Sequence, residues 1–285
     1  GIRNTRTEMN VPMNRKTSLH IVGKDAETCA RYEACKKSFV NLAFAKEILV
    51  QENKDGIGED AVSVVVSDAV VYMPLEDLVD REKEIERLKK EYPDADCTLD
   101  YDDAWKLLVS VRLAAQCTDA RVNVVVEGLY AKYPDVNALA EATPEEIEEI
   151  VRPCGLGKSK ARDISACMKM LRDEYGGKVP DDFDALLKLP GVGRKSANLI
   201  MGDVFGKPAI VTDTHCIRLT NRIGLVDGIK EPKKVEMALW KIIPPEEGSD
   251  LCHRLVYHGR EICTARTKPY CDRCCLADVC KKVGV

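Results

Sequence analysis

The sequence predicts a mainly α-helical protein preceded by a small α/β segment. Three observations predict this fold class. Residues 18–73 contain short β-branched runs, helical runs follow one another from about Asp100, and a Gly-apolar-Gly turn occurs twice among those runs. The change of character places a domain boundary near 90–100. We therefore expect an α/β domain over residues 1–92 and a helical domain over residues 93–285.

The N-terminal segment mixes strand and helix signals. Residues 18–22 (SLHIV) read as a short strand, and residues 63–73 (SVVVSDAVVYM) hold two β-branched runs around a Ser-Asp pair, which is a hairpin signal. The apolar positions of residues 27–48 (ETCARYEACKKSFVNLAFAKEI) have helical spacing and predict helix there. Residues 76–92 (EDLVDREKEIERLKKEY) predict a charged amphipathic helix with ion partners four residues apart.

The helical part contains an internal repeat. Thr143 before Pro144 marks a capped helix start. Further on, residues 153–164 (PCGLGKSKARDI) and 189–200 (LPGVGRKSANLI) align without gaps, 36 residues apart. Each copy fits a helix, a two-glycine hairpin and a second helix, whose N-terminal amides are able to hold a phosphate. Two tight helix–helix turns are the alternative interpretation. The matched glycine pairs are Gly155 and Gly157 in the first copy and Gly191 and Gly193 in the second.

Lys195 stands at the start of the helix that follows the second turn. A nucleotide-triphosphate loop is excluded, because that motif needs adjacent Gly and Lys, whereas Arg194 separates Gly193 from Lys195. Lys195 aligns with Ser159 in the first copy, so the turn itself does not require a lysine. The positive end of the helix dipole disfavours a charged amine there, which suits a nucleophile. A phosphate contact is equally compatible with the charge.

Composition bounds the classes of function. The 285 residues are 45% hydrophobic and 32% charged, which suits about two globular units. No apolar run approaches the ~20 residues of a membrane span, and no secretory signal opens the chain. We therefore expect a cytoplasmic protein without membrane contact. The net charge is −4, but residues 185–285 hold 17 Lys and Arg against 11 Asp and Glu. This asymmetry points weakly to a polyanion partner, the alternative being a mixed solvated surface.

The thirteen cysteines are unevenly distributed. Without a secretory signal a disulfide framework is not expected, and the eight scattered cysteines fit buried apolar positions. The other five crowd into residues 263–280, where a C-x7-C-x2-C-x5-C spacing suits zinc or a [4Fe–4S] cluster. Zinc sites usually show two CxxC knuckles and only one is present, so the spacing favours iron–sulfur. The five are Cys263, Cys271, Cys274, Cys275 and Cys280.

Residues 93–285 resemble endonuclease III, a family of helix-hairpin-helix, iron–sulfur DNA glycosylases. The matching motifs run in the family's order through about two thirds of the chain. They are AAQCTDARVN (114–123), GLGKSKA (155–161), LPGVGRKSAN (189–198), VTDTHCIRLTNR (211–222), HGR (258–260) and the cysteine cluster. The resemblance implies a two-lobed helical DNA glycosylase fold, with a helix-hairpin-helix over about 185–205, an iron–sulfur loop over 263–280, and DNA bound between the lobes.

The resemblance also implies roles for individual residues. Lys195 matches the family's nucleophile, and Asp213, in VTDTH, matches its catalytic carboxylate. Gln116 matches the residue that fills the gap left by a flipped base, and Leu156 the wedge into the opposite strand. The other implied DNA-binding residues are Gly191, Gly193, Arg194 and His215. The implied cluster ligands are Cys263, Cys271, Cys274 and Cys280.

Two departures from the family pattern concern the cysteine cluster. Seven residues rather than six separate Cys263 from Cys271, which lengthens the loop without removing a ligand. Cys275 adds a thiol beside Cys274 and could compete as a ligand. Both bear on the stability of the cluster.

The N-terminal segment resembles a different family. Residues 2–16 (IRNTRTEMNVPMNRK) and 63–91 (SVVVSDAVVYMPLEDLVDREKEIERLKKE) are similar to the C-terminal part of valyl-tRNA synthetase, up to the beginning of its coiled-coil arm. No synthetase active site is present, so aminoacylation is not implied. The resemblance implies a joined segment, either an inert folded appendage or one that retains a tRNA contact.

The function implied by the main resemblance is that of a bifunctional DNA glycosylase and abasic-site lyase of base excision repair. It would remove oxidised pyrimidines from double-stranded DNA through a lysine Schiff base and nick 3′ to the abasic site by β-elimination, as a monomer associated with the bacterial nucleoid. An adenine–DNA mismatch glycosylase is the nearest alternative, although that relative usually lacks the lysine. A non-catalytic DNA- or tRNA-binding fusion is the other.

Overall fold

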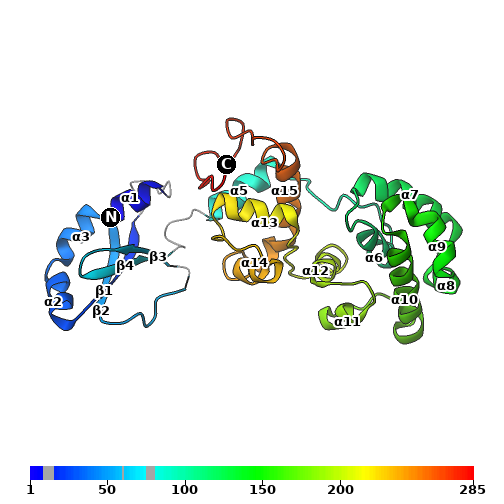
Figure 1. The fold of residues 1–285 in the computed structure, drawn as a ribbon, viewed down its shortest axis with the longest axis horizontal. Helices are drawn as coiled ribbons and strands as arrows, with labels where there is room; N and C mark the ends of the chain where they lie inside the picture. Colours follow the sequence, from blue (N-terminus) through cyan, green and yellow to red (C-terminus); the bar gives the residue numbers. More distant parts are fainter. Residues whose placement is uncertain (9–15, 60, 75–80) are drawn as a thin grey trace. The chain divides into compact units, whose positions relative to one another are not determined.

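A computed structural model describes residues 1–8, 16–59, 61–74 and 81–285 (Figure 1). Parts of two sequence predictions, residues 9–15 and 76–80, lie outside these ranges. The chain divides into two compact units. The first comprises Gly1–Pro93, Ile217–Glu231 and Tyr257–Val285, and the second comprises Asp94–Cys216 and Pro232–Val256. No helix in the described ranges is both long and apolar enough to cross a membrane.

The N-terminal part of the first unit is built on a four-stranded sheet. Its strand order is β2-β1-β4-β3, with β1 and β2 parallel and the other neighbours antiparallel. The predicted first strand and the predicted hairpin, β3 with β4, are confirmed. The strands are β1 Thr17–Gly23, β2 Ala45–Gln51, β3 Val62–Val65 and β4 Ala69–Met73, and the helices beside them are α1 Ile2–Glu8, α2 Ala26–Ala34 and α3 Lys36–Leu42.

The helix predicted over residues 27–48 is wrong at its C-terminal end. Phe44 takes a left-handed φ of 54°, which ends the helical run, and β2 follows as a strand parallel to β1. Ile48 of β2 pairs with Leu19, and both side chains are buried in the core of the sheet. Pairing with a neighbouring strand therefore overrides the local helical spacing, as β-sheet context commonly does.

The remainder of the first unit surrounds the cysteine-rich segment. Helix α5 (Arg81–Glu91) confirms the predicted charged helix within the described residues. Its Arg87 donates hydrogen bonds to the carbonyl oxygen of Cys275 (3.1 Å) and to the carboxylate of Asp278 (2.9 Å to Oδ2). Tyr92, just after α5, lies 3.2 Å from Nδ1 of the buried His258. These contacts fix α5 against the segment that holds the clustered cysteines.

The second unit is helical, as predicted. Its core is formed by the apolar faces of these helices, including Leu107, Leu129, Ile164 and Ile200. The helices are α6 Ala104–Leu113, α7 Asp119–Lys132, α8 Val136–Glu141, α9 Pro144–Val151, η1 Arg152–Cys154, α10 Gly157–Tyr175, α11 Phe183–Lys188, α12 Arg194–Asp203, α14 Pro232–Leu239 and η2 Pro245–Glu247. Two more, α13 Thr214–Ile223 and α15 Gly248–Glu261, contribute residues to both units.

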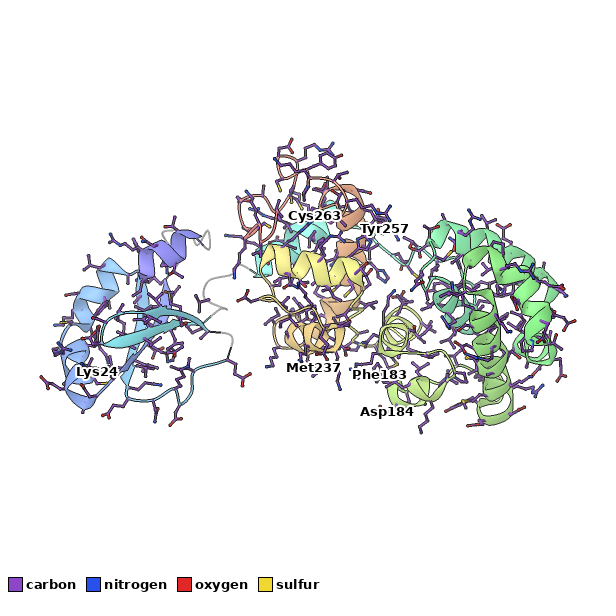
Figure 2. The ribbon with its side chains drawn as sticks, in the orientation of Figure 1. Lys24, Phe183, Asp184, Met237, Tyr257 and Cys263 are labelled. Atoms are coloured by element: carbon purple, nitrogen blue, oxygen red, sulfur yellow. The ribbon has the colours of Figure 1, made fainter. Side chains whose placement is uncertain are left out.

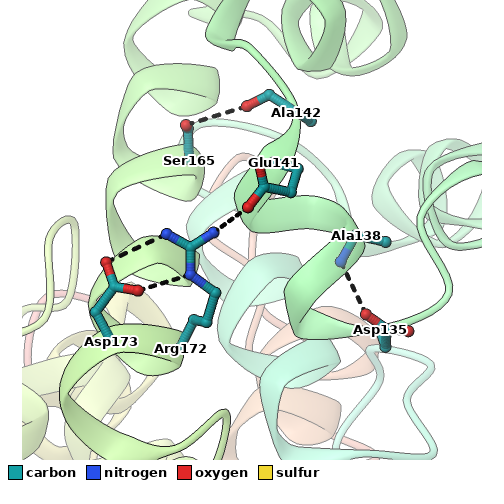
Figure 3. A network of polar contacts seen from close by, with 7 residues as sticks. All are labelled: Asp135, Ala138, Glu141, Ala142, Ser165, Arg172 and Asp173. Carbon is teal, nitrogen blue, oxygen red and sulfur yellow. Dashed lines mark hydrogen bonds and ion pairs between the residues drawn. The ribbon is translucent and has the colours of Figure 1, made fainter.

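Helix α10 is the longest in the second unit and packs against α8 and α9 (Figure 1). Arg172 bridges to Glu141 at the end of α8, and the Ser165 hydroxyl donates to the carbonyl of Ala142 at 3.4 Å (Figure 3). The predicted cap of α9 is confirmed, because the Thr143 hydroxyl accepts from the Glu146 amide at 3.3 Å. These contacts with α8 and the residue that follows it hold α10 in place within the second unit.

A buried carboxylate fixes the C-terminal end of α12. Asp203 Oδ1 lies 2.8 Å from His253 Nε2 and accepts from the Ser249 hydroxyl at 3.2 Å, and both partners belong to α15. Burial of the imidazole alone lowers the pKa of His253, but the hydrogen bond and charge of Asp203 outweigh it, so the pKa is raised. A histidine facing a carboxylate is thus part of the packing between the two helices.

We predict that Asp203→Asn makes stability less dependent on pH near neutrality. Because the pKa of folded His253 is raised, its contribution is complete below the unfolded value of about 6.5 and is lost as pH rises through the folded pKa. The wild type should exceed the variant by about 2 kcal/mol in unfolding free energy at the acidic end, and the difference should shrink towards alkaline pH. Urea unfolding of both proteins, below pH 6.5 and above the folded pKa of His253, measures this difference in unfolding free energy. A difference that stays constant or grows with pH would contradict the assignment.

Candidate active site

The second glycine turn joins α11 to α12. Gly191 has a φ of 78°, and the Val192 amide closes the turn by donating to Leu189 O at 3.1 Å. Gly193 is the N-cap of α12 with extended backbone (φ −101°, ψ 177°), and no side chain caps the helix. The first amides of α12 are therefore left for an external acceptor, and such amides favour anions.

The two glycines of this turn serve different purposes. A Cβ on Gly191 would lie 3.0 Å from both Arg112 Cδ and Asp163 Cβ, and its positive φ already disfavours other residues. Arg112 donates to Asp163 Oδ2 through Nε (2.9 Å) and Nη2 (2.7 Å), so the turn rests on an ion pair between α6 and α10. A Cβ on Gly193 meets nothing within 4 Å. Gly191 fits the protein interior, whereas Gly193 leaves the outer face open.

Arg194 and Lys195 are the first two residues of α12, and their side chains make different contacts. The Arg194 guanidinium pairs with both oxygens of Glu236 (2.9 Å from Nε to Oε2), whose side chain is only 2% exposed. Its Cζ also lies over the ring of Phe183, 4.9 Å from the centroid. Phe183 is at the start of α11 (Figure 2). Lys195 is exposed and makes no hydrogen bond or ion pair with the described part of the chain. The Lys195 amine is thus available, while Arg194 is held within the unit.

Asp213 precedes α13 directly. Its Oδ1 accepts a hydrogen bond from the Cys216 amide at 2.7 Å, which is the N-cap contact compatible with its sequence position. The residue is half-buried, as is His215 in the first turn of the helix. The cap fixes the carboxylate in one orientation at the surface of the second unit, the unit that also carries Lys195.

Gln116 and Leu156 share an uncommon backbone conformation. Gln116 has a φ of 58° and Leu156 a φ of 52°, so both are left-handed without being glycine. This conformation costs roughly 1–2 kcal/mol for a residue with a side chain, and such residues tend to occur at functional sites. Both side chains are exposed, and that of Leu156 reaches 55% although it is apolar. Each turn presents a side chain outward at a cost in folding energy.

Four cysteines of the first unit line one pocket. Cys263 lies just after α15 (Figure 2), and the other three are Cys271, Cys274 and Cys280. Its wall also includes the buried His258, and Cys275 is outside it. Within the described ranges, no three or more His, Cys, Asp or Glu side chains are placed to hold a single metal ion. The four cysteines therefore line a common space.

Hydrogen bonds distinguish Cys274 from Cys275. The Cys275 thiol donates to Cys274, and this bond, with one from His258 (3.3 Å from Nε2), holds the pKa of Cys274 well below its usual range despite burial. The same bond raises the pKa of Cys275. The Leu276 amide also donates to Cys274 Sγ, at 3.4 Å. Cys274 is thus the acceptor of the pair and Cys275 its donor.

Sequence reasoning missed three buried polar residues that support these elements. Glu236 is the partner of Arg194, and no sequence pattern in its helix indicates that its side chain is buried. Asp203 and His253 are 50 residues apart and were not connected by any pattern. A fourth, Lys160, did carry a signal: it falls among the buried positions of α10, with Ile164 one turn later, where a lysine is unexpected.

The chain is similar to proteins of DNA repair. Residues 109–245 match the model of the HhH-GPD superfamily of base excision DNA repair proteins. Endonuclease III of Synechocystis is 44% identical over 194 residues, covering 68% of this chain and 88% of that protein. Endonuclease III of Escherichia coli K12 is 38% identical over 195 residues, covering 68% and 92%.

Solved structures of DNA glycosylases are also similar to this chain. A trapped covalent intermediate of endonuclease III with DNA, an estranged-adenine complex, is 40% identical with a TM-score of 0.68, covering 72% of this chain and 97% of that chain. A thermostable thymine-DNA glycosylase matches with a TM-score of 0.63 at 23% identity over 70% of this chain and 94% of its own, which shows a shared fold.

We predict that Gly191→Ala destabilises the protein and that Gly193→Ala does not. Alanine at position 191 must adopt a left-handed φ and push against Arg112 and Asp163, costing at least about 1–2 kcal/mol. Alanine at position 193 meets open space with an accessible φ. Thermal unfolding followed by circular dichroism compares the two variants. Equal melting temperatures for them would contradict the different roles of the glycines.

Proposed function

This chain belongs to the endonuclease III family of base excision DNA glycosylases, and we propose that Lys195 is the nucleophile of its reaction. One observation carries this proposal. Lys195 is exposed at the uncapped start of α12, without a partner among the described residues, while the neighbouring Arg194 is neutralised by Glu236. An amine that is not engaged in an ion pair is free to bond to carbon.

The proposed substrate is double-stranded DNA with a damaged base or an abasic site, bound by a monomer. The open amides at the start of α12 would hold a phosphate, and the missing side chain at Gly193 would let the backbone approach it. Flipping a nucleotide out of the stack costs a few kcal/mol, less when the base is damaged. The exposed Gln116 and Leu156 would offset this cost by filling the vacated space.

The chemistry proceeds through a covalent bond to the sugar. The neutral Lys195 amine attacks C1′ of the deoxyribose, and the bond from C1′ to the base breaks, with its electron pair leaving on the base, which takes up a proton. The attached nitrogen then loses a proton, its lone pair breaks the bond from C1′ to the ring oxygen, and that oxygen takes up a proton, which gives a protonated Schiff base. This acidifies C2′, and loss of a C2′ proton breaks the bond from C3′ to oxygen. The strand is thus nicked 3′ to the lesion by β-elimination.

Asp213 is the proposed electrostatic partner of this sequence. Its Oδ1 is committed to the Cys216 amide, which fixes the carboxylate in place before the substrate arrives. The carboxylate would stabilise positive charge that develops on the sugar as the base departs, and it would accept and return protons during ring opening. His215 follows in the same helix turn, where we propose a DNA-facing role rather than a proton-transfer role. Oxidised pyrimidines are the base class we propose.

The cysteine-lined pocket fits a [4Fe–4S] cluster. Such a cluster takes one thiolate on each of four irons, which agrees with four cysteines that line one pocket. Backbone amides already donate to Cys274 Sγ and Cys280 Sγ. The cluster, when bound, would supply iron–thiolate bonds that fasten the segment. Cys275 would remain a hydrogen-bond donor to Cys274 rather than a ligand.

The lengthened loop between Cys263 and Cys271 is compatible with this ligand set. The Tyr270 amide donates to Ile262 O at 3.0 Å, which closes the loop at its base, and the hydroxyls of Thr264 and Thr267 lie 2.8 Å apart within it. The extra residue is therefore absorbed inside a closed loop. We assign the N-terminal sheet no part in the reaction, and we propose a cytoplasmic, DNA-associated location.

We predict that Lys195→Gln abolishes strand nicking and borohydride trapping on abasic duplex while DNA binding is retained, because the amide cannot form a Schiff base. Gel assays of cleavage and of the trapped adduct measure this. Lys178→Gln removes an exposed charge outside the glycine turns and should behave as wild type. Nicking by Lys195→Gln at the wild-type rate, or an adduct that maps to another residue, would refute the assignment.

We predict that Cys274→Ser loses the visible absorption and bound iron of the cluster, whereas Cys275→Ser retains both. Cys274 lines the pocket and Cys275 does not. Iron content and the absorption spectrum of the purified variants give the answer without reference to activity. Loss of iron in Cys275→Ser with retention in Cys274→Ser would reverse the ligand assignment.

A further inference from the structure

Lys160 is a fully buried lysine that the proposed chemistry does not use. Its side chain is 0% exposed, in the first turn of α10. Nζ donates one hydrogen bond to Leu113 O at 2.7 Å and another to Cys154 O at 2.9 Å. Burying an ammonium group is costly unless its protons are satisfied, and here two backbone carbonyls from separate segments accept two of its three N–H protons. Such a group is kept in a core only where it makes specific contacts.

The two carbonyls belong to the starts of the two strained turns. Leu113 ends α6, and Gln116 lies three residues further on. Cys154 ends η1, and Leu156 lies two residues further on. These carbonyls lie at helix ends, where no intrahelical partner is available to them, and the negative end of the helix dipole favours a cation there. A single ammonium group therefore connects both turns.

This connection matters because neither turn is in a relaxed conformation. A left-handed residue with a side chain persists only where its surroundings over-determine it. The Lys160 amide also donates to Leu156 O at 3.0 Å, so backbone and side chain of one residue hold the Leu156 turn from two sides. Lys160 contacts the Gln116 turn only through the hydrogen bond to Leu113 O, and the Cys117 amide closes that turn by donating to Ala114 O at 3.1 Å.

We propose that Lys160 is a positioning residue that couples the Gln116 and Leu156 turns, so that the two side chains enter DNA as one unit. The inference rests on the proposed function, in which these side chains fill the space left by a flipped nucleotide. Lys160 itself touches no substrate. Its contribution is therefore to the opening of a stacked duplex and not to the covalent step at Lys195.

The test compares one lesion in two contexts. An abasic site in a fully paired duplex must be opened against stacking, whereas the same site in a mismatched bubble is already unstacked. Lys160→Met keeps the aliphatic stem and removes the donor. The single-turnover nicking rate on the duplex should fall about tenfold or more relative to wild type, the size expected for buried acceptors that lose their partner, while the rate in the bubble changes little.

Matched variants separate positioning from general destabilisation. Lys169→Met makes the same change at an exposed position of α10 and should leave both rates unchanged. In a Leu156→Ala background, Lys160→Met should lower the duplex rate by much less than in the wild type, because one of the coupled side chains is already absent. If Lys160→Met does not fold, Lys160→Gln, which retains an amide donor of shorter reach, takes its place in the same comparison.

The outcomes distinguish the two levels of the proposal. A wild-type protein that nicks neither substrate would contradict the proposed function. A wild-type protein that nicks both, together with a Lys160 variant whose duplex and bubble rates fall by the same factor or not at all, would contradict the coupling alone. A selective fall on the duplex that vanishes in the Leu156→Ala background establishes it.

Discussion

The ion pair between Arg112 and Asp163 is the contact on which the arrangement of the site depends. It joins α6 to α10, and Gly191 lies so close above it that a single added carbon would touch both side chains. The next residue after Arg112 is Leu113, whose carbonyl accepts from Lys160 on the same face of α10. One helix–helix interface thus supports the glycine turn that begins α12 and the two turns that carry exposed left-handed residues.

The start of α12 holds two neighbouring cations, of which one is paired and the other is exposed. Successive helix residues point about 100° apart, so Arg194 turns inward to Glu236 while Lys195 faces solvent. A buried carboxylate with a single bidentate arginine is charge-balanced. The arginine is therefore held by the carboxylate, and the neighbouring lysine is left exposed. The exposure of the Lys195 amine beside a paired arginine is in this way a property of packing as much as of sequence.

The helices, the glycine turns and the hairpin of the N-terminal sheet could be predicted from sequence because each is determined by local chemistry. Apolar periodicity, a Thr-Pro cap and glycines with positive φ carry their own signals. Strand β2 could not be predicted from sequence, because its apolar residues have helical spacing and pairing with β1 overrides that local preference. Neither could the pairs of Arg194 with Glu236 and Asp203 with His253, because a polar contact across more than 40 residues leaves no periodic trace. The family resemblance supplied the expected site residues, but not their supports.

The two copies of the glycine turn share a backbone geometry but differ in the side chains that they present. Gly155 and Gly191 both have positive φ, so the turn is conserved between the copies in geometry. Helix α10, however, begins at Gly157, one position earlier than α12 does relative to the repeat. Leu156, the N-cap of α10, lies in the left-handed region and is exposed, whereas the equivalent Val192 is half-buried. The hydroxyl of Ser159, the counterpart of Lys195, accepts a hydrogen bond from Arg112 Nη2 at 3.3 Å, and a second cation at this position would be repelled by the guanidinium. One turn therefore exposes an apolar side chain, and the other exposes an amine that has no ion-pair partner among the described residues.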